Sequence, residues 1–114
     1  MLTEHYSQVL TVLSNLYPVF KQPNTILKIG IYQDIVHCPK YQLIKHVIPR
    51  SVLSKFLYRH TSSMKYLYAM KSTGHVWRHD LQNEPVSHVS RLDKERAKTR
   101  LKVVHNRLQE TKEE

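Results

Sequence analysis

The sequence predicts a single domain that is mainly α-helical and carries one small β-hairpin. Apolar residues recur at intervals of three and four along much of the chain, which is the spacing of a helix face. Only two of the 114 residues are glycine, which argues against a sandwich built from many tight turns. One pair of strand-like segments flanks the turn D-L-Q-N-E-P. We expect the domain to span residues 1–110, followed by a frayed tail at 111–114.

The N-terminal part is expected to form a helix, a loop and a second, buried helix. Thr3 can cap the first helix. Its apolar face consists of Val9, Leu10, Val12, Leu13 and Leu16. Pro18 and Pro23 bracket a loop. Residues 27–36, L-K-I-G-I-Y-Q-D-I-V, then indicate a short buried helix, and a strand is the competing interpretation because Ile and Val favour strands.

A helix over residues 49–61 dominates the middle of the chain. It follows a helical turn expected at 40–48, and Pro49 suits its first position. Its apolar side consists of Val52, Leu53, Phe56 and Leu57. Arg50 and Arg59 flank that side, whereas Lys55 points away from it.

Two further helices and the hairpin complete the prediction. Residues 61–63 end the preceding helix and cap the next, over 63–71, whose inner side chains are Leu67 and Met70. Residues 75–79 pair with 85–89 in the hairpin. Ser90 then begins the last helix with S-R-L-D, an approximate capping box. The apolar stripe of that helix consists of Leu92, Ala97, Leu101, Val104 and Leu108.

The distribution of charge indicates a polyanionic partner. The formal net charge is +9, and no Asp or Glu occurs between His37 and His79. The basic residues of that stretch are Lys40, Lys45, Arg50, Lys55, Arg59, Lys65, Lys71 and Arg78. A folded segment this one-sided repels itself unless a polyanion lies against it. Nucleic acid is the leading candidate and an anionic membrane surface is the second.

Several other classes of protein are disfavoured. The single cysteine, Cys38, fits a reducing compartment, and the N-terminus lacks the features of a signal peptide, so we expect a cytoplasmic protein that does not bind membranes. The histidines include one closely spaced pair, His75 and His79, which is too few ligands for a zinc site. The acidic residues form no metal-binding motif, so neither a cofactor nor an enzyme is predicted. A DNA-binding repressor that uses helix 49–61 or 63–71 is the alternative function.

Three segments in order resemble the ProQ/FinO domain of bacterial RNA chaperones. They are L-K-I-G-I-Y-Q-D-I, H-T-S-S-M-K-Y-L-Y and R-H-D-L-Q-N-E-P-V, and the resemblance spans residues 8–108. It implies a mostly helical domain with a small hairpin. It also implies binding to the base of terminator hairpins and their single-stranded 3′ U-tail, in support of small-RNA regulation of messengers. We expect structured RNA as the partner, small RNAs and messenger 3′ ends among them, and a monomer with no small-molecule substrate.

The resemblance also implies a 3′-end pocket, which would hold the end of the RNA strand, and it assigns roles there to individual residues. Thr61, Ser62 and Ser63 match the turn that presents backbone N–H groups to the RNA end. Tyr66 matches the tyrosine of the 3′-end pocket, and Arg78 matches its arginine.

Basic residues outside that pocket are expected to hold the RNA duplex. Lys28 matches the basic residue of the K-I-G-I segment, with Asp34 as its acidic partner, and Arg50 matches a basic position at the start of the basic helix. Two positions that are usually basic in the family are Ser54 and Tyr58 here. Lys55 and Arg59, one residue later in each case, are expected to supply the missing charges. The candidate RNA-binding residues are therefore Lys28, Arg50, Lys55, Arg59, Thr61, Ser62, Ser63, Lys65, Tyr66 and Arg78.

Overall fold

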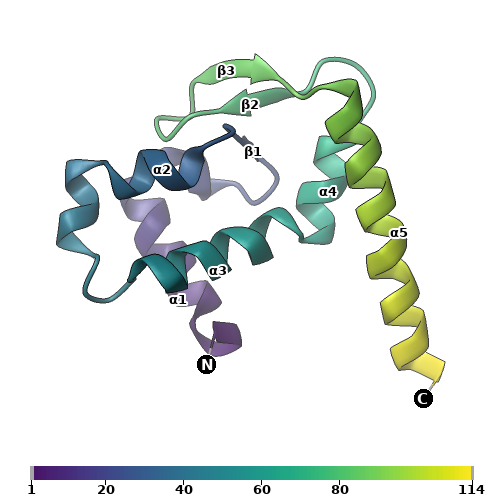
Figure 1. The fold of residues 1–114 in the computed structure, drawn as a ribbon, viewed down its shortest axis with the longest axis horizontal. Helices are drawn as coiled ribbons and strands as arrows, with labels where there is room; N and C mark the ends of the chain where they lie inside the picture. Colours follow the sequence, from purple (N-terminus) through teal and green to yellow (C-terminus); the bar gives the residue numbers. More distant parts are fainter. Residues whose placement is uncertain (1, 114) are drawn as a thin grey trace.

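A helical body, a small sheet and a long C-terminal helix make up the computed structural model of the chain (Figure 1). The structure describes the backbone of residues 2–113 and the side chains of residues 6–107. The α-helices of this part are α1 (Leu2–Leu16), α2 (Ile31–Val36), α3 (Arg50–Thr61), α4 (Met64–Met70) and α5 (Arg91–Glu113). Two 3-10 helices are η1 (Pro18–Lys21) and η2 (Pro39–Leu43). The strands are β1 (Ile26–Leu27), β2 (Trp77–His79) and β3 (Pro85–His88), so the predicted fold class is confirmed.

The main core lies between α1, η1, β1, α2 and α3. The predicted apolar face of α1 is confirmed, because Val9 and Leu13 are buried and Leu10, Val12 and Leu16 are partly buried against the core. Large aromatic side chains fill the space between the helices: Tyr17, Phe20 and Phe56. The helix already includes Leu2, and the side chain of Thr3, predicted to cap it, lies outside the described residues.

The sheet has one strand more than the sequence predicted. β1 pairs in parallel with β2, with Ile26 opposite Arg78, and β3 completes the order β1-β2-β3. The prediction of one helix over 27–36 is therefore wrong in its first half. Gly30 adopts a left-handed φ of 87°, which few other residues tolerate, and α2 begins after it. The predicted hairpin is confirmed, with shorter strands than expected.

The predicted helices 49–61 and 63–71 are confirmed as α3 and α4. Pro49 lies at the N-cap of α3 with an extended backbone and not at its first helical position. The predicted turn at 40–48 is the 3-10 helix η2 followed by turns, and the proline-bracketed loop contains η1. Ser63 caps α4, since its hydroxyl accepts a hydrogen bond from the N–H of Tyr66.

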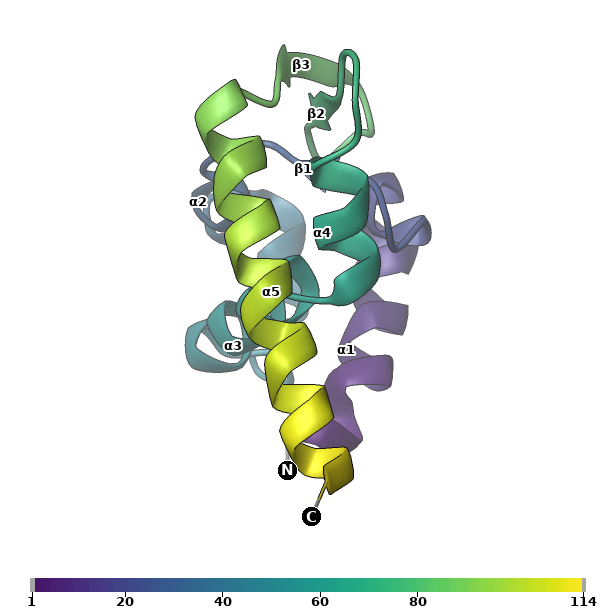
Figure 2. The ribbon, with the colours of Figure 1, turned by 90° about the vertical axis from the view of Figure 1, so that its right-hand side faces the viewer.

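The last helix, α5, packs on α4 through a small separate core formed by Leu67, Ala97 and Leu101. Figure 2 shows the two helices side by side, with α5 running past the end of α4. The prediction that Leu92 joins the apolar stripe is wrong. It is 60% exposed, because five residues at 100° each turn it away from the side that carries Ala97. The side chain of Leu108 lies outside the described residues, and the expected fraying of 111–114 stays a prediction.

Within the described part of the chain, no helix combines the length and the apolar character that a membrane crossing requires.

Candidate nucleic-acid interface

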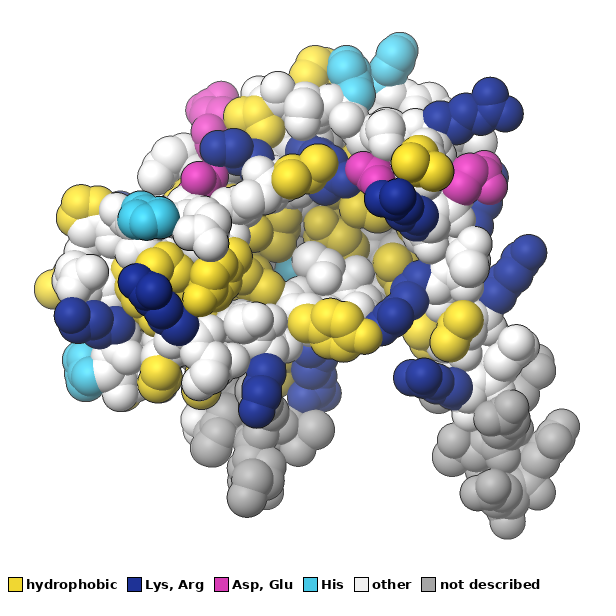
Figure 3. Space-filling model, viewed as in Figure 1, with side chains coloured by type: hydrophobic (Ala, Val, Ile, Leu, Met, Phe, Trp, Pro, Cys, Tyr) yellow, Lys and Arg dark blue, Asp and Glu magenta, His cyan; other side chains and the backbone are white. Residues whose placement is uncertain are grey.

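A pocket of about 330 Å³ lies where the end of α3, α4, β2 and α5 meet. We call it the front pocket. It is lined by Tyr58, Thr61, Ser62, Leu67, Met70, Arg78, Asp93, Arg96, Ala97 and Arg100. Figure 3 shows that this face of the molecule is hollowed between the sheet, α3 and α5, with Lys and Arg side chains along the α5 edge. The fold thus gathers Thr61, Ser62 and Arg78 from the predicted site into one concave surface.

In the turn between α3 and α4, the backbone N–H groups of Ser62 and Ser63 are bonded within the protein. The N–H groups of Ser62 and Ser63 are donated to the carbonyls of Tyr58 and His60 at the end of α3. The Thr61 hydroxyl donates to the Leu57 carbonyl over 2.9 Å, and the Ser63 hydroxyl donates to the His60 carbonyl. Among the described residues, the Ser62 hydroxyl makes no hydrogen bond. It is therefore the group of this turn that remains available to a ligand in the pocket.

Arg78 and Tyr66 are tied to the backbone of β1. The Arg78 side chain is buried, with Nη1 donating to the Leu27 carbonyl over 3.0 Å and Nη2 in a 2.9 Å ion pair with Asp93. The Tyr66 hydroxyl accepts a hydrogen bond from the N–H of Leu27 over 3.0 Å. Tyr66 is only 2% exposed, and this burial raises the pKa of its hydroxyl. Tyr66 lies beneath the pocket wall, where it positions β1 and through it Arg78.

Two arginines that the sequence pattern did not single out complete the pocket. The Arg100 guanidinium donates a hydrogen bond to the Tyr58 hydroxyl and lies 5.2 Å from the centre of its ring. Arg96 reaches the second oxygen of Asp93 over 3.4 Å. Their spacing of four residues was a usable signal, because it places both on one side of a helix. That side could be recognised as a pocket wall only once α5 was placed against α4.

The basic residues of α3 lie beside the front pocket and not in it. Arg50 begins the helix, about 16 Å from Thr61 by the rise of 1.5 Å per residue. Lys55 is exposed. Arg59 is also exposed and faces α1, where its guanidinium lies 4.8 Å from the centre of the Tyr6 ring. These residues extend the positive charge of the interface away from the pocket along α3.

Two predicted residues lie elsewhere. Lys28 forms a 2.8 Å ion pair with Asp34, in agreement with the partner that the resemblance implies, and this hydrogen bond raises the pKa of Lys28. Asp80 lines the same shallow depression. Lys65 lies on the opposite side of α4 from the front pocket, in a second depression. Neither Lys28 nor Lys65 therefore lines the front pocket that contains Arg78, although Lys28 lies close to it in the sheet, where its N–H donates to the His79 carbonyl.

No group of three or more potential metal ligands occurs among the described residues. The ring of His75 packs against that of His88, with the centres 4.8 Å apart, and His88 in turn packs on Trp77 at 3.8 Å. These exposed rings of the hairpin are in contact with one another and away from the front pocket.

Comparisons with known proteins agree with the arrangement of these elements. The model of the ProQ/FINO family matches residues 3–114. Among solved structures, the fold is similar to that of a FinO-like RNA chaperone from Neisseria meningitidis, with a TM-score of 0.60 and 21% sequence identity. The match covers 83% of this chain and 92% of that one. A search of curated proteins found no match.

Proposed function

This chain belongs to the ProQ/FINO family, and we propose that it is a non-catalytic RNA-binding protein that holds the base of a hairpin and the adjoining 3′ strand. The similar fold of a protein described as a FinO-like RNA chaperone supports this proposal. The observation that carries it is the front pocket, where three arginines and one aspartate surround a partly apolar floor.

The chemistry of the front pocket suits an RNA backbone. A guanidinium is planar and always charged, and it binds a phosphate through two parallel hydrogen bonds. The floor, formed by Leu67 and Met70, suits the apolar faces of sugars and bases. A-form duplexes are recognised by shape and backbone, because side chains cannot enter their deep major groove. Arg96 and Arg100 would therefore bind phosphates, with little preference for sequence.

The Ser62 hydroxyl is the group that we propose recognises the strand end. It lies in the same pocket as Arg78 and makes no hydrogen bond among the described residues. A hydroxyl can both donate to and accept from a free 3′-OH. Tyr66 supports this site indirectly, because it holds the strand against which Arg78 is placed.

The basic residues of α3 would supply affinity without selectivity. Arg50, Lys55 and Arg59 are exposed and lie beyond the pocket, where the duplex would continue. Lysine and arginine contacts to phosphate release counterions, so this part of the binding energy depends strongly on salt.

A strand-end comparison tests the proposal. A hairpin with a U-tail and a 3′-OH should bind at least about fivefold tighter than the same RNA with a 3′-phosphate or without a tail, because an unpaired buried polar group costs about 1–3 kcal/mol. Ser62→Ala should remove most of that difference. Ser54→Ala, an exposed serine on α3, is the matched control. Equal binding of all three RNAs by the native protein would refute the strand-end site.

Two further arms separate RNA binding from other functions. Duplex DNA of equal length should compete poorly with the hairpin, whereas strong competition would favour a DNA-binding repressor. Magnesium should cause no cleavage of the RNA, because the front pocket has a single carboxylate, and a two-metal site needs more.

The biological setting is also part of the proposal. We infer a monomer in the cytoplasm that binds small RNAs and messenger 3′ ends and supports regulation after transcription. Sequencing RNA that is crosslinked to the protein in its host should enrich terminator hairpins with U-tails. A crosslinked population without such 3′ ends would contradict this setting.

A further inference from the structure

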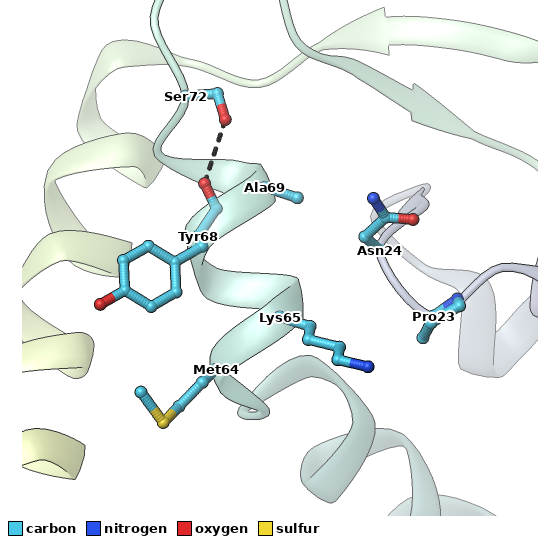
Figure 4. Close-up of a pocket in the computed structure, with 7 residues that line it drawn as sticks. All are labelled: Pro23, Asn24, Met64, Lys65, Tyr68, Ala69 and Ser72. Carbon is cyan, nitrogen blue, oxygen red and sulfur yellow. Dashed lines mark hydrogen bonds between the residues drawn. The ribbon is translucent and has the colours of Figure 1, made fainter.

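A second depression of about 660 Å³ lies on the other side of α4, which we call the rear groove (Figure 4). It is lined by Pro23, Asn24, Met64, Lys65, Tyr68, Ala69 and Ser72. Figure 2 shows α4 with α5 on one side and the segment that leads from α1 to β1 on the other.

The rear groove and the front pocket occupy opposite sides of one helix. Leu67 and Met70 of α4 line the front pocket, whereas Lys65 and Tyr68 line the rear groove. At 100° per residue, the direction of Leu67 and Met70 differs from that of Lys65 and Tyr68 by nearly half a turn of the helix. A ligand in one of these sites therefore leaves the other accessible.

The basic residues of α5 are divided between the same two sides. Taking buried Ala97 as the inner position, Arg96 and Arg100 turn about 100° and 60° to one side, where they line the front pocket. Lys94, Lys98 and Lys102 turn about 60–140° to the opposite side. Arg96 and Arg100 thus lie on the front of the helix, and the three lysines lie on the rear.

Two contacts place the lysine side of α5 next to the rear groove. Lys94 Nζ donates to the carbonyl of Ser72 over 2.7 Å. His105 is hydrogen-bonded through Nε2 to the hydroxyl of Tyr68 over 2.8 Å. Both Ser72 and Tyr68 line the rear groove.

We propose that the rear groove is a second RNA-binding surface, which takes a further unpaired strand while the front pocket holds the base of a hairpin and its 3′ end. This inference rests on the proposed function. Tyr68 is 44% exposed and offers a ring on which a base can stack. In Figure 4 the ring lies on the α5 side of the groove, while Lys65 extends toward Pro23 and Asn24.

The electrostatics of the rear groove favour a phosphate backbone. None of the described residues that line it is acidic. The Lys71 ammonium lies over one face of the Tyr68 ring, 5.2 Å from its centre, and adds positive charge beside the groove. A base would therefore stack on the other face of the ring, or take the place of this ammonium. Aromatic stacking combined with lysines is the usual composition of a surface that binds single strands without sequence preference. An acidic peptide would be attracted by the same lysines but would gain nothing from the ring.

Simultaneous binding is the consequence that can be tested. The intact chain is first saturated with a hairpin RNA that carries a U-tail and a 3′-OH, so that the strand-end site of the front pocket is filled. A labelled oligouridine of about 12 nucleotides that ends in a 3′-phosphate is then titrated by fluorescence anisotropy. We expect the oligouridine to bind the loaded and the unloaded protein with affinities that agree within about threefold, since the two sites share no lining residue. Displacement of the hairpin in proportion to bound oligouridine would overturn the proposal.

Variants assign the oligouridine to the rear groove. Lys65→Ala with Tyr68→Ala should weaken oligouridine at least about fivefold, the low end for one stacked base, and hairpin binding less than about twofold. Lys65→Glu with Lys102→Glu changes only exposed side chains, so it gives the same test if the loss of Tyr68 disturbs the fold. Unchanged oligouridine affinity in both variants would overturn the proposal.

Two controls separate the possible failures. Arg96→Ala with Arg100→Ala should weaken the hairpin and leave the oligouridine bound. Poly-glutamate of the same length should compete weakly, and competition equal to that of oligouridine would overturn the assignment to RNA. A protein that binds oligouridine in the groove but no hairpin would refute the proposed function alone. A protein that binds the hairpin but no oligouridine would refute the rear groove alone.

Discussion

The front pocket and the rear groove share α4 and α5 but differ in how their basic side chains are held. In the front pocket Arg78 and Arg96 are paired with Asp93, and Arg100 is bonded to Tyr58. In the rear groove Lys65 extends from an exposed position on α4. Side chains that are already fixed lose less conformational entropy when they bind. The comparison suggests that the front pocket selects the shape of its RNA, whereas the rear groove accepts any flexible strand.

The largest effect should come from loosening the contact between α4 and α5, because both surfaces depend on it. Leu101→Ala removes a buried side chain from a core with few members and should lower the free energy of unfolding by about 2–5 kcal/mol. Leu92→Ala on the same helix is the control, and its exposed side chain should cost less than about 0.5 kcal/mol. Chemical denaturation measures both. Equal effects would mean that α5 is not held through this core.

The next effect separates the two surfaces. Arg96→Ala with Arg100→Ala should weaken hairpin binding by about tenfold or more, because each hydrogen bond to a charged group contributes about 1.5–3 kcal/mol. Lys98→Ala with Lys102→Ala removes the same charge from the other side of α5 and should change hairpin binding less than about twofold. Filter binding or anisotropy gives both values. Similar losses in the two double variants would mean that net charge decides binding and not the pocket.

A smaller effect is expected from the basic residues of α3. Lys55→Ala with Arg59→Ala should weaken hairpin binding a few fold and leave the fold intact, since both side chains are exposed. For the native protein, log K should fall with log salt at a slope of about −4, as for five neutralised phosphates. The double variant should reduce that slope by about 2 at most. A native slope near zero would exclude the basic surface as the binding site.

The smallest effect at neutral pH concerns the stability of the core that supports α4. Buried His60 lies in this core and contacts α4 through Tyr66. Its ring packs against Tyr66 and Phe56, and its Nε2 has no hydrogen-bond partner among the described residues. Burial lowers the pKa of His60, so the folded protein resists protonation while the unfolded chain takes up a proton near pH 6.5. The contribution of His60 to the free energy of unfolding should therefore be fully present above about pH 6.5 and should be lost as the pH falls below it.

Thermal unfolding followed across that range tests the role of His60. His60→Phe should flatten the dependence of Tm on pH, whatever it does to Tm itself. His37→Phe, at an exposed position, is the matched control and should leave the native slope. An unchanged slope in His60→Phe would place the pH dependence in other groups.

The sequence predicted local elements well and the relations between distant ones poorly. The helix α3 was predictable, because its apolar spacing and flanking proline are local signals. β1 was not, because a strand of two residues exists only through its pairing with a partner some fifty residues later. The structural role of Arg78 was not predictable for the same reason, because it depends on bonds to the distant residues Leu27 and Asp93. Arg78 is thus a structural residue as well as a candidate RNA-binding residue.

Prediction of the candidate site was limited in the same way, because contacts between distant segments decide which residues share a pocket. Resemblance to a family pointed to Ser62 and Arg78, which do share a pocket. The basic stretch between His37 and His79 pointed to Lys65, which the rotation of α4 carries to the other face. The roles of Arg96 and Arg100 follow only from the side of α5 that meets α4. That side is the one on which Ala97 and Leu101 pack against Leu67.

Mapping of backbone amide shifts by NMR tests the central claim most directly. The isotope-labelled protein is titrated first with a hairpin RNA that carries a U-tail and a 3′-OH, and then with an oligouridine that ends in a 3′-phosphate. The hairpin should shift the amides of Ser62, Arg96 and Arg100, and the oligouridine should shift those of Lys65 and Tyr68. One common set of shifted amides for both RNAs, or hairpin shifts confined to Lys65 and Tyr68, would contradict the account.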